Sequence, residues 1–170
     1  MLRSFAAQAL LPAMAKEIER KFLVSGPDWR SLAMAKVEIR QFYLASTEGR
    51  SLRVRITDGV KAKLTLKFGE QGRERDEFEY SIPLVDAEAM REFAVGNVIE
   101  KTRHHVSHRG HLYEVDVFHG PLTGLIIAEL ETPEEVAASM LPPWLGREVT
   151  GEAQYYNSSL ALGDIPEAVA

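Results

Sequence analysis

Charged and apolar residues alternate along much of the chain with the period of two residues that is typical of β-strands. In the first such stretch, Glu17, Glu19 and Lys21 fall on one face, and Ile18 and Phe22 fall on the other. Six further segments repeat the pattern, with charged positions at Arg53 and Arg55; Lys61, Lys63 and Lys67; Arg75, Glu77 and Glu79; Lys101 and Arg103; Glu114 and Asp116; and Glu129 and Glu131. The alternation predicts strands that share one charged face.

The number of these strands indicates how their charged faces are arranged. An exposed sheet face would account for charges on two or three strands, but charges of both signs on seven favour faces that meet each other. A sheet that closes into a barrel brings them together and leaves the apolar faces outside, where helices must cover them. Opposed buried charges are costly unless something bridges them, as a polyanion with a divalent metal would. The sequence therefore predicts an α+β fold, an antiparallel β-barrel of about eight strands around a charged tunnel, with helices packed outside.

Turn and capping residues predict the connections between these strands. Asp58-Gly59 and Arg109-Gly110 are typical of hairpin turns. A helix is predicted over residues 86–93, because it begins with a capping aspartate and is followed by Gly96. Two more are predicted over residues 133–140, which begin with proline, and over residues 151–162. Trp29 and Trp144 are expected in the core rather than in a ligand site.

The composition limits the class of protein. A chain of 170 residues that is 45% hydrophobic suits one domain with one core. Its formal net charge of −5 predicts no nucleic-acid partner, although a local basic lining stays compatible with it. Without cysteine, neither a disulfide nor a thiolate zinc site can form. No apolar run reaches the roughly 18 residues of a membrane span, so we expect no membrane association and a cytoplasmic protein.

The first 13 residues differ from the rest, because they are apolar and alanine-rich with a single Arg3. Ala13-Met14-Ala15 is similar to a signal-peptide cleavage site, but the positive region before it is thin. Cleavage there would also leave the first charged strand at the extreme terminus. We therefore interpret residues 1–13 as a disordered or loosely helical leader, and residues 14–170 as the single working domain.

The stretch Glu17-Ile18-Glu19-Arg20-Lys21 resembles the E-x-E-x-K signature of the CYTH superfamily, also called the triphosphate tunnel metalloenzymes. The resemblance runs from Met14 to about Leu162. It includes RQFYL at 40–44, LRVR at 52–55, TLK at 65–67, EKTR at 100–103, EVDVF at 114–118, ELE at 129–131 and GREVT at 146–150. It is closest to the short, single-domain bacterial members, which resemble inorganic triphosphatases more than the cyclase branch. Such relatives make a homodimer a reasonable expectation. One departure is that Ala153, Gln154 and Tyr155 stand where these members commonly carry Lys-Arg-Tyr, so a basic contact at the end of the tunnel is expected to be missing.

This resemblance implies a tunnel domain that hydrolyses inorganic tripolyphosphate to pyrophosphate and phosphate with Mg²⁺ or Mn²⁺. Carboxylates two residues apart on a strand can share one hard cation, and a nearby lysine can reach a phosphate bound to it. The expected phosphate ligands are Lys21, Arg53, Arg55, Lys67 and Arg103, with Lys63 assisting. The expected metal ligands are Glu17, Glu19, Glu129 and Glu131, with Asp116 and Glu114 as further metal or water ligands.

The resemblance also implies that Lys101 and Tyr43 form the catalytic pair that activates the attacking water. Arg103 and other cations near Lys101 should lower its pKa and make it a usable base at alkaline pH. Glu77 and Glu79 are instead expected to pair across the tunnel and orient the arginines.

Other functions compete with this interpretation. A class IV-type adenylate cyclase, or another nucleoside or thiamine triphosphatase, would share the fold. However, no distinct cluster of aromatic or amide residues that would bind a nucleobase is evident. A non-catalytic polyphosphate-binding module is disfavoured because Lys101 and Tyr43 are both present. His104, His105, His108 and His111 could indicate zinc, but their spacing does not match a helical His pair, and oxygen-preferring metals suit the carboxylates better. The P-loop pattern is absent.

Overall fold

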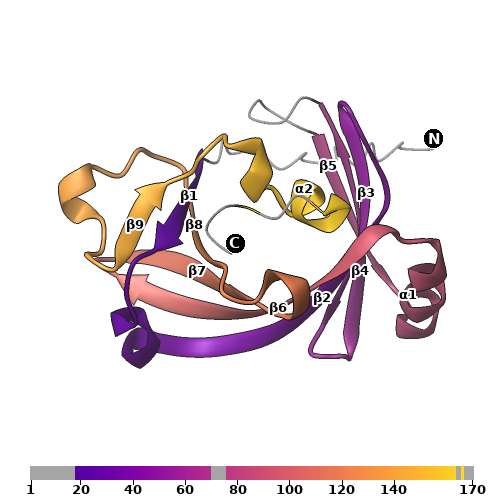
Figure 1. Cartoon of the computed structure of the whole chain (residues 1–170), viewed down its shortest axis with the longest axis horizontal. Helices are drawn as coiled ribbons and strands as arrows, with labels where there is room; N and C mark the ends of the chain where they lie inside the picture. Colours follow the sequence, from indigo (N-terminus) through magenta and orange to yellow (C-terminus); the bar gives the residue numbers. More distant parts are fainter. Residues whose placement is uncertain (1–17, 70–75, 164–165, 167–170) are drawn as a thin grey trace, which may run out of the picture.

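Nine antiparallel strands form one strongly curved sheet in the computed structural model, which describes residues 18–69, 76–163 and 166 (Figure 1). The strands are β1 (Ile18–Val24), β2 (Ala33–Thr47), β3 (Arg50–Thr57), β4 (Lys61–Phe68), β5 (Asp76–Ile82), β6 (Val95–His108), β7 (His111–Phe118), β8 (Ile126–Thr132) and β9 (Leu145–Glu148). Their order in space is β5-β4-β3-β2-β6-β7-β8-β1-β9. The predicted antiparallel, tunnel-like α+β fold is confirmed. Among the described residues, however, β5 and β9 remain the two edges, so the expected closure of the sheet is not seen.

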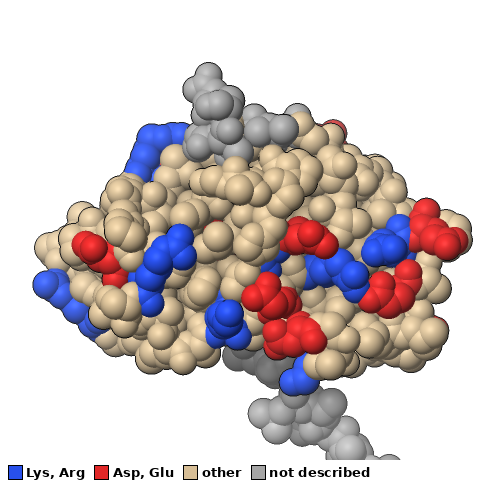
Figure 2. Space-filling view, turned by 60° about the horizontal axis from the view of Figure 1, so that its bottom comes forward, with Lys and Arg blue, Asp and Glu red and all other residues tan. Residues whose placement is uncertain are grey.

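Apolar clusters cover the convex side of the sheet, as predicted. One lies under helix α1 (Leu84–Met90), where Phe42, Val54 and Ile56 pack against Ala87. The other lies below the 3₁₀ turn η1 (Asp28–Leu32), and its buried members are Trp29, Val106, Tyr113, Val115, Ala128, Leu130, Val136 and Trp144. Both tryptophans are therefore core residues. In Figure 2, which brings forward the lower side of Figure 1, acidic and basic side chains lie interspersed.

A third apolar cluster occupies one end of the concave side. Ile99, Phe118 and Ile127 come from the sheet, and they contact Leu160 and Ala161 of helix α2 (Asn157–Leu162). Figure 1 shows α2 between the two rising walls of the sheet. Gly96 permits this approach, because a Cβ there would lie 2.3 Å from the carbonyl oxygen of Ala161. One part of the concave face is therefore lined by charged side chains, and its other end is filled with apolar side chains.

The two predicted hairpin turns are confirmed. Asp58 and Gly59 connect β3 to β4 with φ of 51° and 67°. Arg109 and Gly110 connect β6 to β7 with φ of 49° and 82°. These left-handed conformations match the twist that a tight hairpin requires.

The helix predictions had mixed outcomes. The helix predicted over 86–93 is present as α1, followed by the 3₁₀ turn η2 (Arg91–Phe93). The segment 151–162 forms the 3₁₀ turn η5 (Ala153–Tyr155) and then α2, because Tyr156 between them is extended. In that segment Tyr155 and Leu160 are buried, whereas Leu162 is exposed.

The helix predicted over 133–140 was wrong, because only a 3₁₀ turn, η4 (Ala138–Met140), forms there. Side-chain hydrogen bonds, one local and one from a distant strand, occupy two of the carbonyl groups that a helix would need. The Val136 carbonyl accepts from Arg20 at 2.9 Å, and the Glu134 carbonyl accepts from Thr132 at 2.7 Å.

The predicted leader, residues 1–13, and the predicted metal ligand Glu17 lie outside the described residues. Within the described part of the chain, no helix combines the length and the apolar character needed to cross a bilayer.

Candidate active site

The strand register places the predicted site residues on one face of the sheet. Directly opposed residues of antiparallel strands point to the same side of the sheet. On β1, β8, β7 and β6, the opposed pairs are Glu19–Glu131, Lys21–Glu129, Glu129–Glu114 and Asp116–Arg103. On β2, β3 and β4, they are Gln41–Arg55, Tyr43–Arg53 and Arg55–Lys63. Lys101 and Lys67 belong to the same face by alternation. All predicted site residues that the structure describes therefore line the concave side.

Asp116 and Glu129 lie at the centre of a buried ion-pair network. Both oxygens of Asp116 accept bonds from the Arg103 guanidinium at 2.7 Å, and one of them also pairs with Lys101. Glu129 pairs with Lys21 and accepts a further bond from Arg103 at 2.8 Å. Burial opposes ionisation of both carboxyls, but Lys101 and Arg103 hold the pKa of Asp116 below its usual value, and Lys21 and Arg103 do the same for Glu129. Asp116 therefore acts as the counter-ion of two cations, and its role as a metal ligand stays a prediction.

The ammonium group of Lys101 is almost fully enclosed, with 1% of the residue exposed. It pairs with Asp116, donates to Oδ1 of Asn157 at 3.2 Å and lies 5.2 Å from the centre of the Phe118 ring. Burial lowers the pKa of Lys101 to about 8 against the opposing charge of Asp116, and Arg103 lowers it further. The lowered pKa is as expected, but its largest cause is burial rather than neighbouring cations.

Asn157 was missed by the sequence reasoning. It begins α2, far along the chain from the strands, so β-alternation carries no signal for it. It connects the helix that lies on the concave side to the candidate base.

Tyr43 lies at the border between the charged residues and the apolar cluster. Burial raises the pKa of its hydroxyl group, whereas Arg53, to which it is hydrogen-bonded, opposes that shift. The described contacts of Lys101 go to Asp116 and Asn157 instead. Lys101 and Tyr43 share a face, and their action as a pair stays a prediction.

Arg53 and Arg55 form a cationic part of the face. Neither has a carboxylate partner among the ion pairs of the described residues; Arg53 donates to Thr65 at 3.3 Å and Arg55 to Gln41 at 3.0 Å. Burial, then the charges of Arg53 and Arg103, lower the pKa of Arg55 to about 10. Two neighbouring half-buried cations without paired carboxylates repel each other, so this part of the face suits an anionic ligand.

The lysines of β4 already have counter-ions. Lys63 pairs with Glu79 and Lys67 with Glu77, each at 2.6 Å. Glu77 and Glu79 do form ion pairs, but with lysines of the neighbouring strand rather than across the tunnel with arginines, as was expected.

The carboxylates offer only oxygen donors, which fit a hard cation such as Mg²⁺ or Mn²⁺. Glu19 and Glu131 are opposed across β1 and β8, and Glu129 is the next inward residue on β8. Over the residues that the structure covers, which exclude Glu17, no group of three or more His, Asp or Glu side chains forms a metal site. The four histidines do not form one cluster either. His108 and His111 are opposed across β6 and β7, but His104 packs on Trp29, and His105 contacts Glu114 at 3.5 Å on the opposite face.

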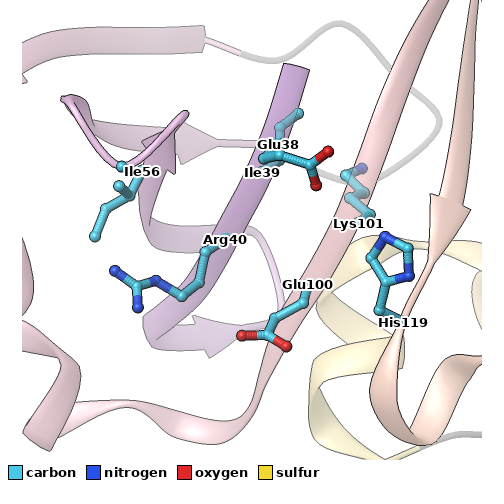
Figure 3. Close-up of a pocket in the computed structure, with 8 residues that line it drawn as sticks. Glu38, Ile39, Arg40, Ile56, Glu100, Lys101 and His119 are labelled. Carbon is cyan, nitrogen blue, oxygen red and sulfur yellow. The ribbon is translucent and has the colours of Figure 1, made fainter. Parts of the chain in front are cut away.

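A pocket of about 350 Å³ opens beside Arg40, Glu100 and His119, and Lys101 is also one of its lining residues. Figure 3 shows that the Lys101 ammonium points away from the carboxylate of Glu100. Alternation along β6 places Glu100 on the convex face and Lys101 on the concave one, so this pocket is not the charged site.

Comparison with known proteins agrees with this arrangement. A CYTH domain model matches residues 15–161. The chain belongs to the CYTH domain family. It is 45% identical over 148 residues to an inorganic triphosphatase of Acetivibrio thermocellus, covering 86% of this chain and 94% of the relative. An inorganic triphosphatase of Nitrosomonas europaea is 41% identical over 151 residues, covering 86% and 97%. The crystal structure of the inorganic triphosphatase NE1496 matches with a TM-score of 0.68 and 38% identity, covering 89% of this chain and 97% of that one.

Residues 153–155, where the resemblance implies that a basic contact is missing, lie next to β9 and α2. Ala153 and Gln154 are exposed, and the Gln154 amide donates to Glu152 at 3.3 Å. Tyr155 is buried in the apolar cluster and accepts from Arg147 at 3.0 Å. The arginine that contacts Tyr155 therefore comes from β9, and not from position 154.

Proposed function

We propose that this CYTH domain hydrolyses inorganic tripolyphosphate to pyrophosphate and phosphate with the help of a divalent cation, Mg²⁺ or Mn²⁺. The observation that carries the proposal is the pair of half-buried arginines, Arg53 and Arg55, that lack carboxylate partners among the ion pairs of the described residues and share the concave surface with a carboxylate-rich part. A polyanion with a bound cation would neutralise both, because its phosphate oxygens would pair with the arginines and its cation with the carboxylates. The names of the relatives support the same substrate.

The residues divide the work of the reaction between them. Arg53, Arg55 and Lys21 bind phosphate oxygens and fix the chain of phosphates. Water forms a bond to the terminal phosphorus, the bond from that phosphorus to the bridging oxygen breaks, and pyrophosphate leaves with the bonding electrons. Lys101 in its neutral form takes the proton that water loses. Glu19, Glu129 and Glu131 would hold the cation, which supplies charge neutralisation at the phosphate oxygens.

Metal dependence tests the carboxylate part of the site. Because Glu19 would hold the cation, Glu19→Gln should lose most activity at saturating tripolyphosphate and recover little with excess Mg²⁺. Phosphate release measured against Mg²⁺ concentration checks this, with Glu48→Gln in an exposed turn as the matched control. Near-normal turnover of Glu19→Gln in EDTA would show that the assignment is wrong.

Substrate choice tests the reaction itself. Phosphate release from tripolyphosphate, ATP and thiamine triphosphate with Mg²⁺ should be fastest for tripolyphosphate. The concave face supplies contacts for phosphate groups and no evident site for a nucleobase. Cyclic AMP formed from ATP at a comparable rate would favour a cyclase. Tight binding of tripolyphosphate without any release would favour a non-catalytic binding module.

A further inference from the structure

Gln41 is a neutral side chain among the cations of the concave face, and it is fully buried, with 0% exposed. Its carbonyl oxygen accepts a hydrogen bond from Nε of Arg55 at 3.0 Å. Its amide nitrogen is buried and has no hydrogen-bond partner among the described residues. The orientation of the amide is fixed, because the Arg55 N–H is a donor and only the carbonyl oxygen can accept it. The nitrogen is therefore a genuine unpartnered donor.

A second unpartnered donor lies at the adjoining position of the same two strands. Nε of Arg53 is also buried without a partner in the described structure. The register pairs Gln41 with Arg55 and, two residues along, Tyr43 with Arg53, so both donors belong to the same region of the concave face. Leaving buried donors unpaired costs free energy, and both groups can only donate. A ligand rich in acceptor oxygens would satisfy them together.

We propose that Gln41 is a substrate-binding residue whose amide nitrogen donates to a phosphate oxygen while its carbonyl oxygen fixes the guanidinium of Arg55. This inference rests on the proposed function for the identity of the oxyanion. A neutral donor suits the position, because another cation beside Arg53, Arg55 and Arg103 would add repulsion before the substrate arrives. Gln41 also explains why Arg55 is held in place without a carboxylate that would compete with phosphate.

The substitution Gln41→Glu separates the two roles of this side chain. Glutamate has the same shape and still accepts from Arg55, but it cannot donate when ionised, and it brings a negative charge to the phosphate site. The melting temperature without ligand should therefore rise, because the half-buried Arg55 gains a counter-ion. Binding of inorganic pyrophosphate with Mg²⁺, measured by titration calorimetry, should weaken by about tenfold or more. KM for tripolyphosphate should rise in parallel.

Two controls keep the outcomes distinct. Val60→Glu adds the same negative charge at an exposed position of the turn between β3 and β4 and should alter neither measurement. Gln41→Met, which can neither donate nor accept, should also weaken pyrophosphate binding by about tenfold or more, and it provides the test if the glutamate variant does not fold. If wild type releases phosphate from tripolyphosphate but the variants bind pyrophosphate as it does, Gln41 only supports Arg55 and the inference is wrong. If wild type neither binds nor hydrolyses these anions, the proposed function itself fails.

Discussion

Replacing Asp116 by alanine should lower the free energy of unfolding by about 3–5 kcal/mol, the cost of breaking a buried ion pair on one side. Asp116 is 1% exposed, and it is the shared counter-ion of Lys101 and Arg103. Its removal would leave Lys101 without a charged partner in the described structure, and Arg103 with only Glu114 and Glu129. Two cations would then repel each other in a buried setting.

Urea denaturation monitored by circular dichroism measures this loss. The matched control is Glu148→Gln, which breaks the pair between Glu148 and Arg20 at 2.7 Å, where the glutamate side chain is 40% exposed. An exposed pair of this kind contributes about 1 kcal/mol or less. If both variants lost equally little stability, the network around Asp116 would not be the structural centre of the site.

The faces of the strands were predictable from the sequence, because alternation is a local property that fixes which side chains point together. The apolar end of the concave side was harder to see. Ile99, Phe118 and Ile127 lie two residues from Lys101, Asp116 and Glu129 and share their face, so the change from charged to apolar was present in the strands. Helix α2 covers these three apolar side chains, and the position of α2 depends on tertiary contacts such as the one between Gly96 and Ala161.

The partners of the charged residues could not be predicted in the same way. The sequence shows that Asp116 is an inward carboxylate, but only the register of β6 and β7 places it beside Arg103 and Lys101 rather than beside Glu19. The failed helix over 133–140 has a similar cause, because hydrogen bonds from residues distant in sequence decide the backbone there. Gln41 was overlooked because an uncharged residue does not stand out in a pattern of charges.

The turnover rate should depend on Lys101 more than on any other lysine of the face. Below pH 8 its amine is mostly protonated and cannot accept a proton from water. Because burial lowers its pKa to about 8, the neutral form becomes the major one as the pH rises through that value. The kcat for tripolyphosphate should therefore rise from pH 7 to pH 9 and then level off, because a general base must lose its own proton before it can accept one from water.

The contacts of Lys101 explain why the neutral amine would be well oriented. A neutral amine has two N–H groups, and Asp116 and Asn157 can accept one each. The lone pair then points in the one remaining direction. Lys101→Met keeps the length of the side chain and removes this lone pair, so it should lower kcat by about 10²–10⁴-fold, the usual contribution of a general base. Lys36→Met, an exposed lysine on the convex face of β2, should leave kcat unchanged.

A double-mutant cycle tests whether Tyr43 acts with this lysine. If the two residues form one unit, Tyr43→Phe should lower kcat strongly in wild type and little further in Lys101→Met, since residues that act together are non-additive. Additive losses would instead indicate that Tyr43 positions Arg53, to which its hydroxyl group is hydrogen-bonded. A kcat that stays flat from pH 7 to pH 9, together with a Lys101→Met variant close to wild type, would show that water is activated without Lys101.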